Sequence, residues 1–224
     1  MSIAPAAPDV VPQISSVVVS AFDENCYVVV DPTTGAAAIV DPGDEGERII
    51  EAVRATGARP EAVWLTHGHL DHIGALADVL AAWNVPVHMH ALDLPVFRLA
   101  PEAARRYGVP WSPQPEPTHE LIDGQVLELG ALRFTVMHTP GHAPGHVVLH
   151  GHGMALAGDL LFQGSVGRTD LEFADPRAMS RSLARIVELP NETLVYPGHG
   201  PSTTIDRERR LNPFLNGGAR VLGG

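Results

Sequence analysis

Lysine is absent from this chain of 224 residues, and all fifteen basic residues are arginine. Without lysine no Schiff base can form on a side chain, which excludes that class of covalent catalysis. The 26 acidic residues outnumber the basic ones and leave a formal net charge of −11. Nucleic-acid sites need clustered basic residues, and no positively charged tract is present. RNA processing and other functions that bind phosphate chains are therefore disfavoured.

Cysteine and long apolar runs are also scarce. The single Cys26 cannot form an internal disulfide, and its setting in NCYVVV predicts a small core residue rather than a reactive thiol. No stretch reaches the roughly 20 apolar residues of a membrane span. The first residues, MSIAPAAPDVVPQ, lack the basic start and apolar run of a signal peptide. These absences favour a soluble cytoplasmic protein without a membrane partner.

Short β-branched runs alternate with helical patterns along most of the chain. The predicted strands are 15–20, 26–31, 36–41, 62–66, 85–90, 125–129, 132–138, 146–150, 154–158 and 193–197. The predicted helices are 45–56, 72–83 and 176–188. From 91 to 118 the pattern blurs, and the Pro-rich segment 111–119 predicts a loop. A polar tail follows the last strand.

The same order of elements occurs twice along the chain. Each time a run of strands comes first, and strands that alternate with helices follow. It predicts an α/β fold with two β-rich halves, between which the chain crosses near 108–120. Two stacked sheets between two helix layers bury such faces best, which gives a four-layer αββα sandwich. We expect one domain over residues 1–224, because this length is ample for a sizeable core.

Histidine is abundant, with twelve residues, and several stand in the segment THGHLDHIG at 66–74. In an extended chain residues two apart point the same way, so His67, His69 and Asp71 can converge on one pocket. His72 follows at the first turn of the next helix. Four ligand-type residues within six positions exceed what one tetrahedral metal takes from a single loop. The spacing therefore favours two metals that share this loop.

Further candidate ligands follow the ends of other predicted strands. HTPGHAPGH offers His142 in a stiff turn, and VYPGHG offers His199 in another. Asp159 ends the apolar strand ALAGD, where a charge without a cation would be costly. All these candidates offer imidazole nitrogen or carboxylate oxygen and none offers a thiolate, which suits zinc, iron or manganese.

The order H-x-H-x-D-H, G-H, G-D, P-G-H-G resembles the metallo-β-lactamase superfamily, and within it the glyoxalase II-like thioester hydrolases. The resemblance covers nearly the whole chain, since NCYVV and the tail TTIDRERRLNPF at 203–214 are also similar to compact bacterial members. It implies that one metal is held by His67, His69 and His142, and a second by Asp71, His72 and His199. It further implies that Asp159 bridges the two metals, as in glyoxalase II and unlike class B β-lactamases. Asp41 in VDPGD resembles a family residue that hydrogen-bonds a ligand imidazole.

The resemblance also implies a mechanism. Two divalent metal ions, zinc by preference with iron or manganese as alternatives, can share a water and lower its pKa toward about 7. The resulting hydroxide attacks a carbonyl, and Asp71 orients it and takes its proton. A thiolate leaves readily because thiol pKa values lie near about 8.5. The expected substrate is therefore a small-molecule 2-hydroxyacyl thioester such as S-lactoylglutathione.

Two residues bear on the substrate. Phe162 stands where related lactonases carry a tyrosine that assists the oxyanion, which argues against lactone opening. Arg168 in SVGRTD resembles a segment shared by glyoxalase II-like proteins and persulfide dioxygenases, and it either contacts substrate or forms an ion pair with Asp170 or Asp175. Only 25 residues follow His199, so we expect no separate C-terminal substrate domain of the kind that grips glutathione in glyoxalase II. The arginines of the tail are expected on a solvated helix face.

Three rival functions stay open. A mononuclear-iron persulfide dioxygenase would use His67, His142 and Asp159, but the intact P-G-H-G around His199 weighs against it. The others are a metallo-hydrolase of another ester or lactone, and a metal-binding module without catalysis. His138 and His146 flank His142, and His146 stands where many relatives carry Ser or Thr. The remaining histidines are expected to be ordinary strand or turn residues: His88, His90, His119, His150 and His152.

Overall fold

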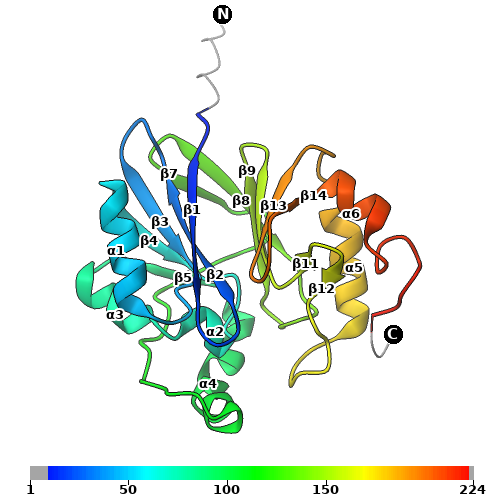
Figure 1. Ribbon diagram of the computed structural model, residues 1–224, viewed down its shortest axis with the longest axis horizontal. Helices are drawn as coiled ribbons and strands as arrows, with labels where there is room; N and C mark the ends of the chain where they lie inside the picture. Colours follow the sequence, from blue (N-terminus) through cyan, green and yellow to red (C-terminus); the bar gives the residue numbers. More distant parts are fainter. Residues whose placement is uncertain (1–9, 222–224) are drawn as a thin grey trace, which may run out of the picture.

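Two six-stranded sheets form the centre of the computed structural model, which describes residues 10–221 (Figure 1). The first sheet has the order β1-β2-β3-β4-β5-β6, with β1 (Gln13–Val19), β2 (Glu24–Val30), β3 (Ala36–Val40), β4 (Arg59–Trp64), β5 (Val87–Met89) and β6 (His119–Glu120). The second has the order β14-β13-β10-β9-β8-β7, with β7 (Val126–Leu129), β8 (Leu132–His138), β9 (Val147–Gly151), β10 (Met154–Gly158), β13 (Leu194–Pro197) and β14 (Thr203–Thr204). A small hairpin, β11 (Leu161–Phe162) and β12 (Ser165–Val166), follows β10.

Side chains alternate along the strands and divide the core into three layers. On β2, Val28 faces the helices outside the first sheet while Val29 faces the second sheet. On β8, Val136 faces the first sheet while Met137 packs under the helices outside the second. Helices α1 (Gly46–Thr56), α3 (Leu76–Ala82) and α4 (Leu94–Tyr107) belong to the first outer layer, and α5 (Pro176–Ile186) and α6 (Ile205–Leu211) to the other. The predicted αββα sandwich is confirmed.

The direction of the strands brings several strand ends to one edge. In the first sheet β3, β4, β5 and β6 are parallel, and in the second sheet β10 and β13 are parallel. Strands β8 and β10 also point in the same direction, because β9 lies between them and pairs antiparallel with each. The loops after β4, β8, β10 and β13 carry the predicted metal ligands, so the fold gathers these loops at one place.

The structure differs from the sequence prediction in three segments. The blurred region contains a short 3-10 helix, η1 (Ala91–Asp93), followed by α4, whose prolines Pro95 and Pro101 obscure the helical pattern. The predicted helix 72–83 is two helices, α2 (Leu70–Ile73) and α3, which meet at Gly74 where a side chain would collide with the backbone of Gly43. The polar tail contains α6, capped by Thr204.

None of the helices within residues 10–221 is both long enough and apolar enough to cross a membrane. The expectation about a signal peptide concerns residues 1–13, most of which lie outside the described part of the chain.

Candidate metal centre

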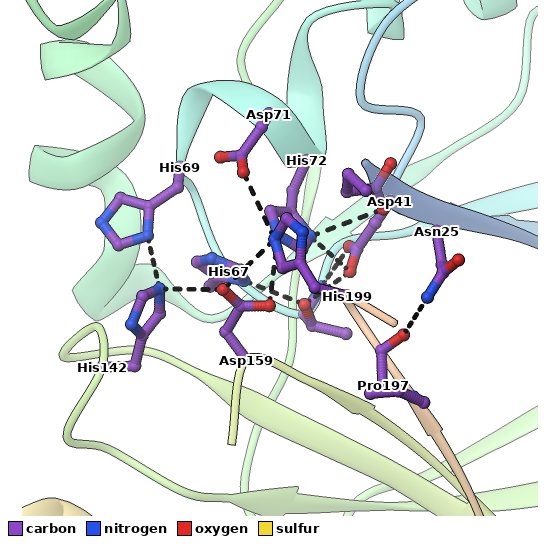
Figure 2. Close-up of polar contacts among 12 residues, drawn as sticks. Asn25, Asp41, His67, His69, Asp71, His72, His142, Asp159, Pro197 and His199 are labelled. Carbon is purple, nitrogen blue, oxygen red and sulfur yellow. Dashed lines mark hydrogen bonds and ion pairs between the residues drawn. The ribbon is translucent and has the colours of Figure 1, made fainter. Parts of the chain in front are cut away.

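The predicted ligands come together above the strand ends, between the two sheets (Figure 2). The ligand atoms of His67, His69 and His142 lie within 4.8 Å of one another, and we call these residues the first ligand group. The same limit holds for Asp71, His72 and His199, the second ligand group. Nδ1 of His69 is 2.8 Å from Nε2 of His142. Nε2 of His199 is 3.4 Å from Oδ2 of Asp71.

The carboxylate of Asp159 lies between the two groups. Its Oδ2 is 3.4 Å from Nε2 of His142 and 3.5 Å from Nε2 of His199. Its Oδ1 is 3.5 Å from Nε2 of His72. Gly198 makes room for this approach, because a side chain there would collide with both Asp159 and His72. Asp159 is therefore placed to contact cations held by either group.

Backbone carbonyls orient two of the imidazoles. Nδ1 of His142 donates to the carbonyl oxygen of Arg168 at 2.8 Å, and Nδ1 of His199 donates to that of Phe22 at 2.9 Å. A carbonyl oxygen only accepts, so Nδ1 carries the proton in both rings. In the neutral form of each ring the lone pair is then on Nε2, which faces Asp159.

Asp41 orients the buried histidines. Its Oδ2 accepts hydrogen bonds from Nδ1 of His72 at 3.0 Å and from the hydroxyl of Thr66 at 2.6 Å. That hydroxyl in turn accepts from Nδ1 of His67 at 3.0 Å. Both rings thus direct Nε2 toward the cluster, and His69 is the exception that turns Nδ1 inward.

The first strands hold the loop that carries His199. The carbonyl oxygen of Pro197 accepts from the side-chain amide of Asn25 at 3.0 Å (Figure 2). It also accepts from the hydroxyl of Tyr27 at 2.7 Å. Gly198 adds a backbone bond, because its carbonyl accepts from the amide of Asn25 at 2.7 Å. The position of His199 is therefore set by β2 of the opposite sheet.

Buried atoms without partners test whether these residues fit a metal. Among the described residues, Nε2 of His67, Nε2 of His72 and Oδ1 of Asp159 are buried and have no hydrogen-bond partner. Unpartnered buried polar atoms are rare because each loses its hydration without compensation. A cation among them would be a partner for all three, and nitrogen with carboxylate oxygen is a donor set for a divalent transition metal. The residues present fit such ions.

The two ligand groups differ in their electrostatics. Burial, reinforced by the neighbouring histidines, holds the pKa of His67 well below its usual range and lowers that of His69 to about 3. Burial acts in the same direction on His72, but the negative charges of Asp159 and Asp41 outweigh it and raise the His72 pKa. For His199, Asp71 and Asp159 likewise outweigh burial and raise the pKa.

Two residues support the ligands in ways that the sequence did not reveal: His146, whose role was left open, and Asp93, which was not considered. His146 accepts a hydrogen bond at its Nε2 from the backbone amide of Asp159 at 3.0 Å, and its Nδ1 donates to Thr139 at 2.9 Å. Asp93 accepts from the backbone amides of Gly68 at 2.6 Å and Gly145 at 2.5 Å, which ties the loops of the first ligand group together. The local sequence does not predict the hydrogen bonds to Asp159, Gly68 and Gly145, because these partners are 13 to 52 positions away along the chain.

Glu24 is a third unforeseen residue. Its side chain is fully buried, with Oε1 3.7 Å from Nδ1 of His72. In the described chain neither carboxylate oxygen has a hydrogen-bond partner, and burial raises the pKa of Glu24 well above its usual range. Outside the cluster, five histidines form no group with metal-ligand spacing in residues 10–221: His88, His90, His119, His150 and His152.

A pocket of about 370 Å³ opens over the cluster, and both predicted substrate residues line it. The ring of Phe162 meets that of His199 edge to face, with centroids 5.9 Å apart. Arg168 makes a two-pronged ion pair with Asp170, at 2.7 and 2.8 Å, rather than with Asp175. Asp71, Asp159 and His199 are exposed to the same pocket, so a bound molecule would reach the candidate metal site.

Comparison with known proteins agrees with this geometry. Residues 19–199 match the profile of the metallo-beta-lactamase superfamily. The chain is 36% identical over 216 residues to the hydroxyacylglutathione hydrolase GloC of Haemophilus influenzae, covering 91% of this chain and 98% of that protein. This relative confirms the resemblance to the glyoxalase II-like members.

Solved structures show the same relationship. TTHA1623, crystallised in a di-iron-bound form, is 44% identical with a TM-score of 0.84, covering 90% of this chain and 100% of that one. The B3 metallo-beta-lactamase BLEG-1 is 36% identical with a TM-score of 0.82, covering 91% and 99%. The chain therefore belongs to the metallo-beta-lactamase superfamily and is a metallo-hydrolase.

Proposed function

We propose that the protein is a thioester hydrolase that cleaves 2-hydroxyacyl thioesters such as S-lactoylglutathione. The observation that carries the proposal is the position of Asp159, between the two ligand groups and on the wall of the pocket. The relative GloC, described as a hydroxyacylglutathione hydrolase, supports the same chemistry. The proposed partner is a small-molecule thioester, since the net charge of −11 disfavours nucleic acid.

The proposed ligand sets follow the two groups. His67, His69 and His142 would hold one divalent ion, and Asp71, His72 and His199 would hold the other. Asp159 lies where it would contact either ion. Zinc is the proposed metal, with iron and manganese as alternatives, and TTHA1623 holds two irons. When bound, the ions supply a Lewis acid for the thioester carbonyl and a water of lowered pKa.

The protein's own groups position the reactants. Asp71 lines the pocket and has its Oδ2 near His199, so its carboxylate can orient a water and accept a proton from it. Burial would raise the pKa of Asp71, but the hydrogen bond to His199 outweighs it and lowers the pKa, which keeps the carboxylate ionised. The leaving thiolate needs no general acid, because thiols ionise near about pH 8.5.

One panel of substrates distinguishes the rival functions. Metal-loaded protein is assayed with S-lactoylglutathione, an aryl ester, a homoserine lactone, a penicillin and a phosphodiester. We expect the thioester to give the highest kcat/KM, and chelated protein to lose the activity. The penicillin is included because the chain is similar to the B3 metallo-beta-lactamase BLEG-1.

Far better turnover of a lactam or lactone than of every thioester would contradict the proposal. Oxygen uptake with glutathione persulfide, measured with an oxygen electrode, would instead favour the dioxygenase. Bound metal without turnover of any substrate would favour a binding module.

A further inference from the structure

The wall of the pocket opposite the hairpin is an apolar stripe on α4. The stripe consists of residues spaced by three and four positions, which places them on one face of the helix: Val96, Leu99, Ala103 and Tyr107. The neighbouring face of α4 packs into the first-sheet core through Phe97 and Ala104. The helix therefore has a second apolar face, and that face borders the pocket.

The other wall is also apolar. It is formed by the β11–β12 hairpin and the loop before α5, through Phe162, Val166, Leu171 and Phe173. Phe173 is 49% exposed and has φ of +67°, a left-handed conformation unusual for a bulky residue. Tyr107, across the same pocket, is 47% exposed. Large exposed apolar side chains around one concavity are typical of a ligand site.

The charged side chains that line the pocket disfavour an anionic ligand. Arg106 has the carboxylate of Glu102 at 3.6 Å, and Arg168 holds Asp170 in a two-pronged ion pair at 2.7 and 2.8 Å. Glu172 adds a further negative charge to the lining. Each arginine of the pocket thus already has a carboxylate partner. The two carboxylates of glutathione would have to displace these partners or remain unpaired.

We infer that the pocket selects thioesters whose thiol part is an uncharged apolar group, in preference to glutathione thioesters. The inference rests on the proposed function and specifies the carrier of the acyl group. Apolar burial between α4 and the loop of Phe173 supplies the binding energy. The paired arginines supply no free cation for the carboxylates of glutathione.

The test compares lactoyl thioesters of three thiols: glutathione, N-acetylcysteamine and 2-phenylethanethiol. Because the acyl group is constant, KM reports how the pocket receives the thiol part. We expect KM with metal-loaded protein to be lowest for 2-phenylethanethiol, at least about tenfold below that for glutathione. Dissociation constants of the matching non-hydrolysable thioethers, measured by calorimetry, should follow the same order.

Variants of the walls test the assignment of residues. Leu99→Asn and Phe173→Asn should each raise KM for the phenylethyl thioester by about tenfold, the effect of an apolar group in a substrate pocket. KM for the glutathione thioester should change less than about twofold. Asp170→Asn should lower KM for the glutathione thioester, since it frees Arg168. Val126→Asn, an exposed apolar residue of β7 outside the pocket, is the matched control and should change neither.

A KM for the glutathione thioester equal to or below that for the phenylethyl thioester would overturn the inference and leave thioester hydrolysis intact. An equal response of both substrates to the wall variants would also overturn it. If none of the three thioesters is cleaved, the proposed function fails and this inference fails with it.

Discussion

The two ligand groups lie on either side of the carboxylate of Asp159 but differ in charge. The first group consists of three imidazoles, His67, His69 and His142, and burial lowers the pKa of each. The second group includes the carboxylate of Asp71. There the carboxylates raise the pKa values of both histidines in spite of burial. The environment of the first group therefore favours neutral imidazoles, whereas protons compete more strongly with a cation at the second group.

With metal bound, this difference would give two positions of unlike character. Neutral nitrogens bind a transition metal without first losing a proton. Carboxylates attract a cation more strongly but attract protons as well. The comparison can be tested by removing Asp159, by removing one ligand of the second group, and by changing the pH.

Removal of the shared ligand should have the largest effect. In Asp159→Ala both positions lose a ligand, and we expect metal content and activity to fall together, with kcat/KM down by about a thousandfold or more. Elemental analysis and kinetics measure the two losses, and circular dichroism checks the fold. Asp123→Ala removes an exposed ion pair with Arg185 and a hydrogen bond from the backbone amide of His138, so it should cost about 1 kcal/mol of stability and keep the activity. Full activity of Asp159→Ala would refute the bridging assignment.

Removal of one ligand from the second group should have an intermediate effect. His199→Ala leaves the three imidazoles intact, so we expect the metal content to fall from close to two ions per chain to close to one. The kcat/KM should fall by about a hundredfold. Elemental analysis counts the ions, and His119→Ala, an exposed residue outside the cluster, serves as the control. A parent protein with one ion, unaffected by His199→Ala, would contradict a two-metal site.

A change of pH should have the smallest effect on the metal content, and it should affect the second ligand group more than the first. Because the pKa values of His72 and His199 are raised, protons compete with metal at the second group already near neutral pH. The pKa values of His67, His69 and His142 are lowered, that of His69 to about 3, so protons compete at the first group only at lower pH. On acidification the second ion should therefore leave first, with affinity falling about tenfold per pH unit for each proton taken up. Metal content after dialysis at stepped pH measures this, and loss of both ions in one step would contradict the contrast.

Local geometry explains why much of the site could be predicted from sequence. His67, His69 and Asp71 converge because extended residues two apart point the same way, and this holds without knowledge of the rest of the fold. Asp159 was recognisable because a charge at the end of an apolar strand needs a partner. The four layers followed from the alternation of strands and helices.

Contacts between distant segments explain what the sequence did not reveal. Asp93 joins two ligand loops, and its partner Gly145 is 52 positions away. The helix α4 was hidden because Pro95 and Pro101 interrupt a pattern that packing against the first sheet stabilises. The apolar pocket arises only when α4 and the loop of Phe173 meet, so neither segment alone predicts it.

The hydrogen bonds from Asn25 and Tyr27 to Pro197 connect a part of the chain that the ribosome makes early to one that it makes late. His67, His69 and His142 have all been translated before these bonds can close. All three residues of the first ligand group are therefore present in the chain before His199 is synthesised. The second ligand group is therefore complete only in a chain that has been synthesised through β13 and in which β2 has contacted the end of that strand.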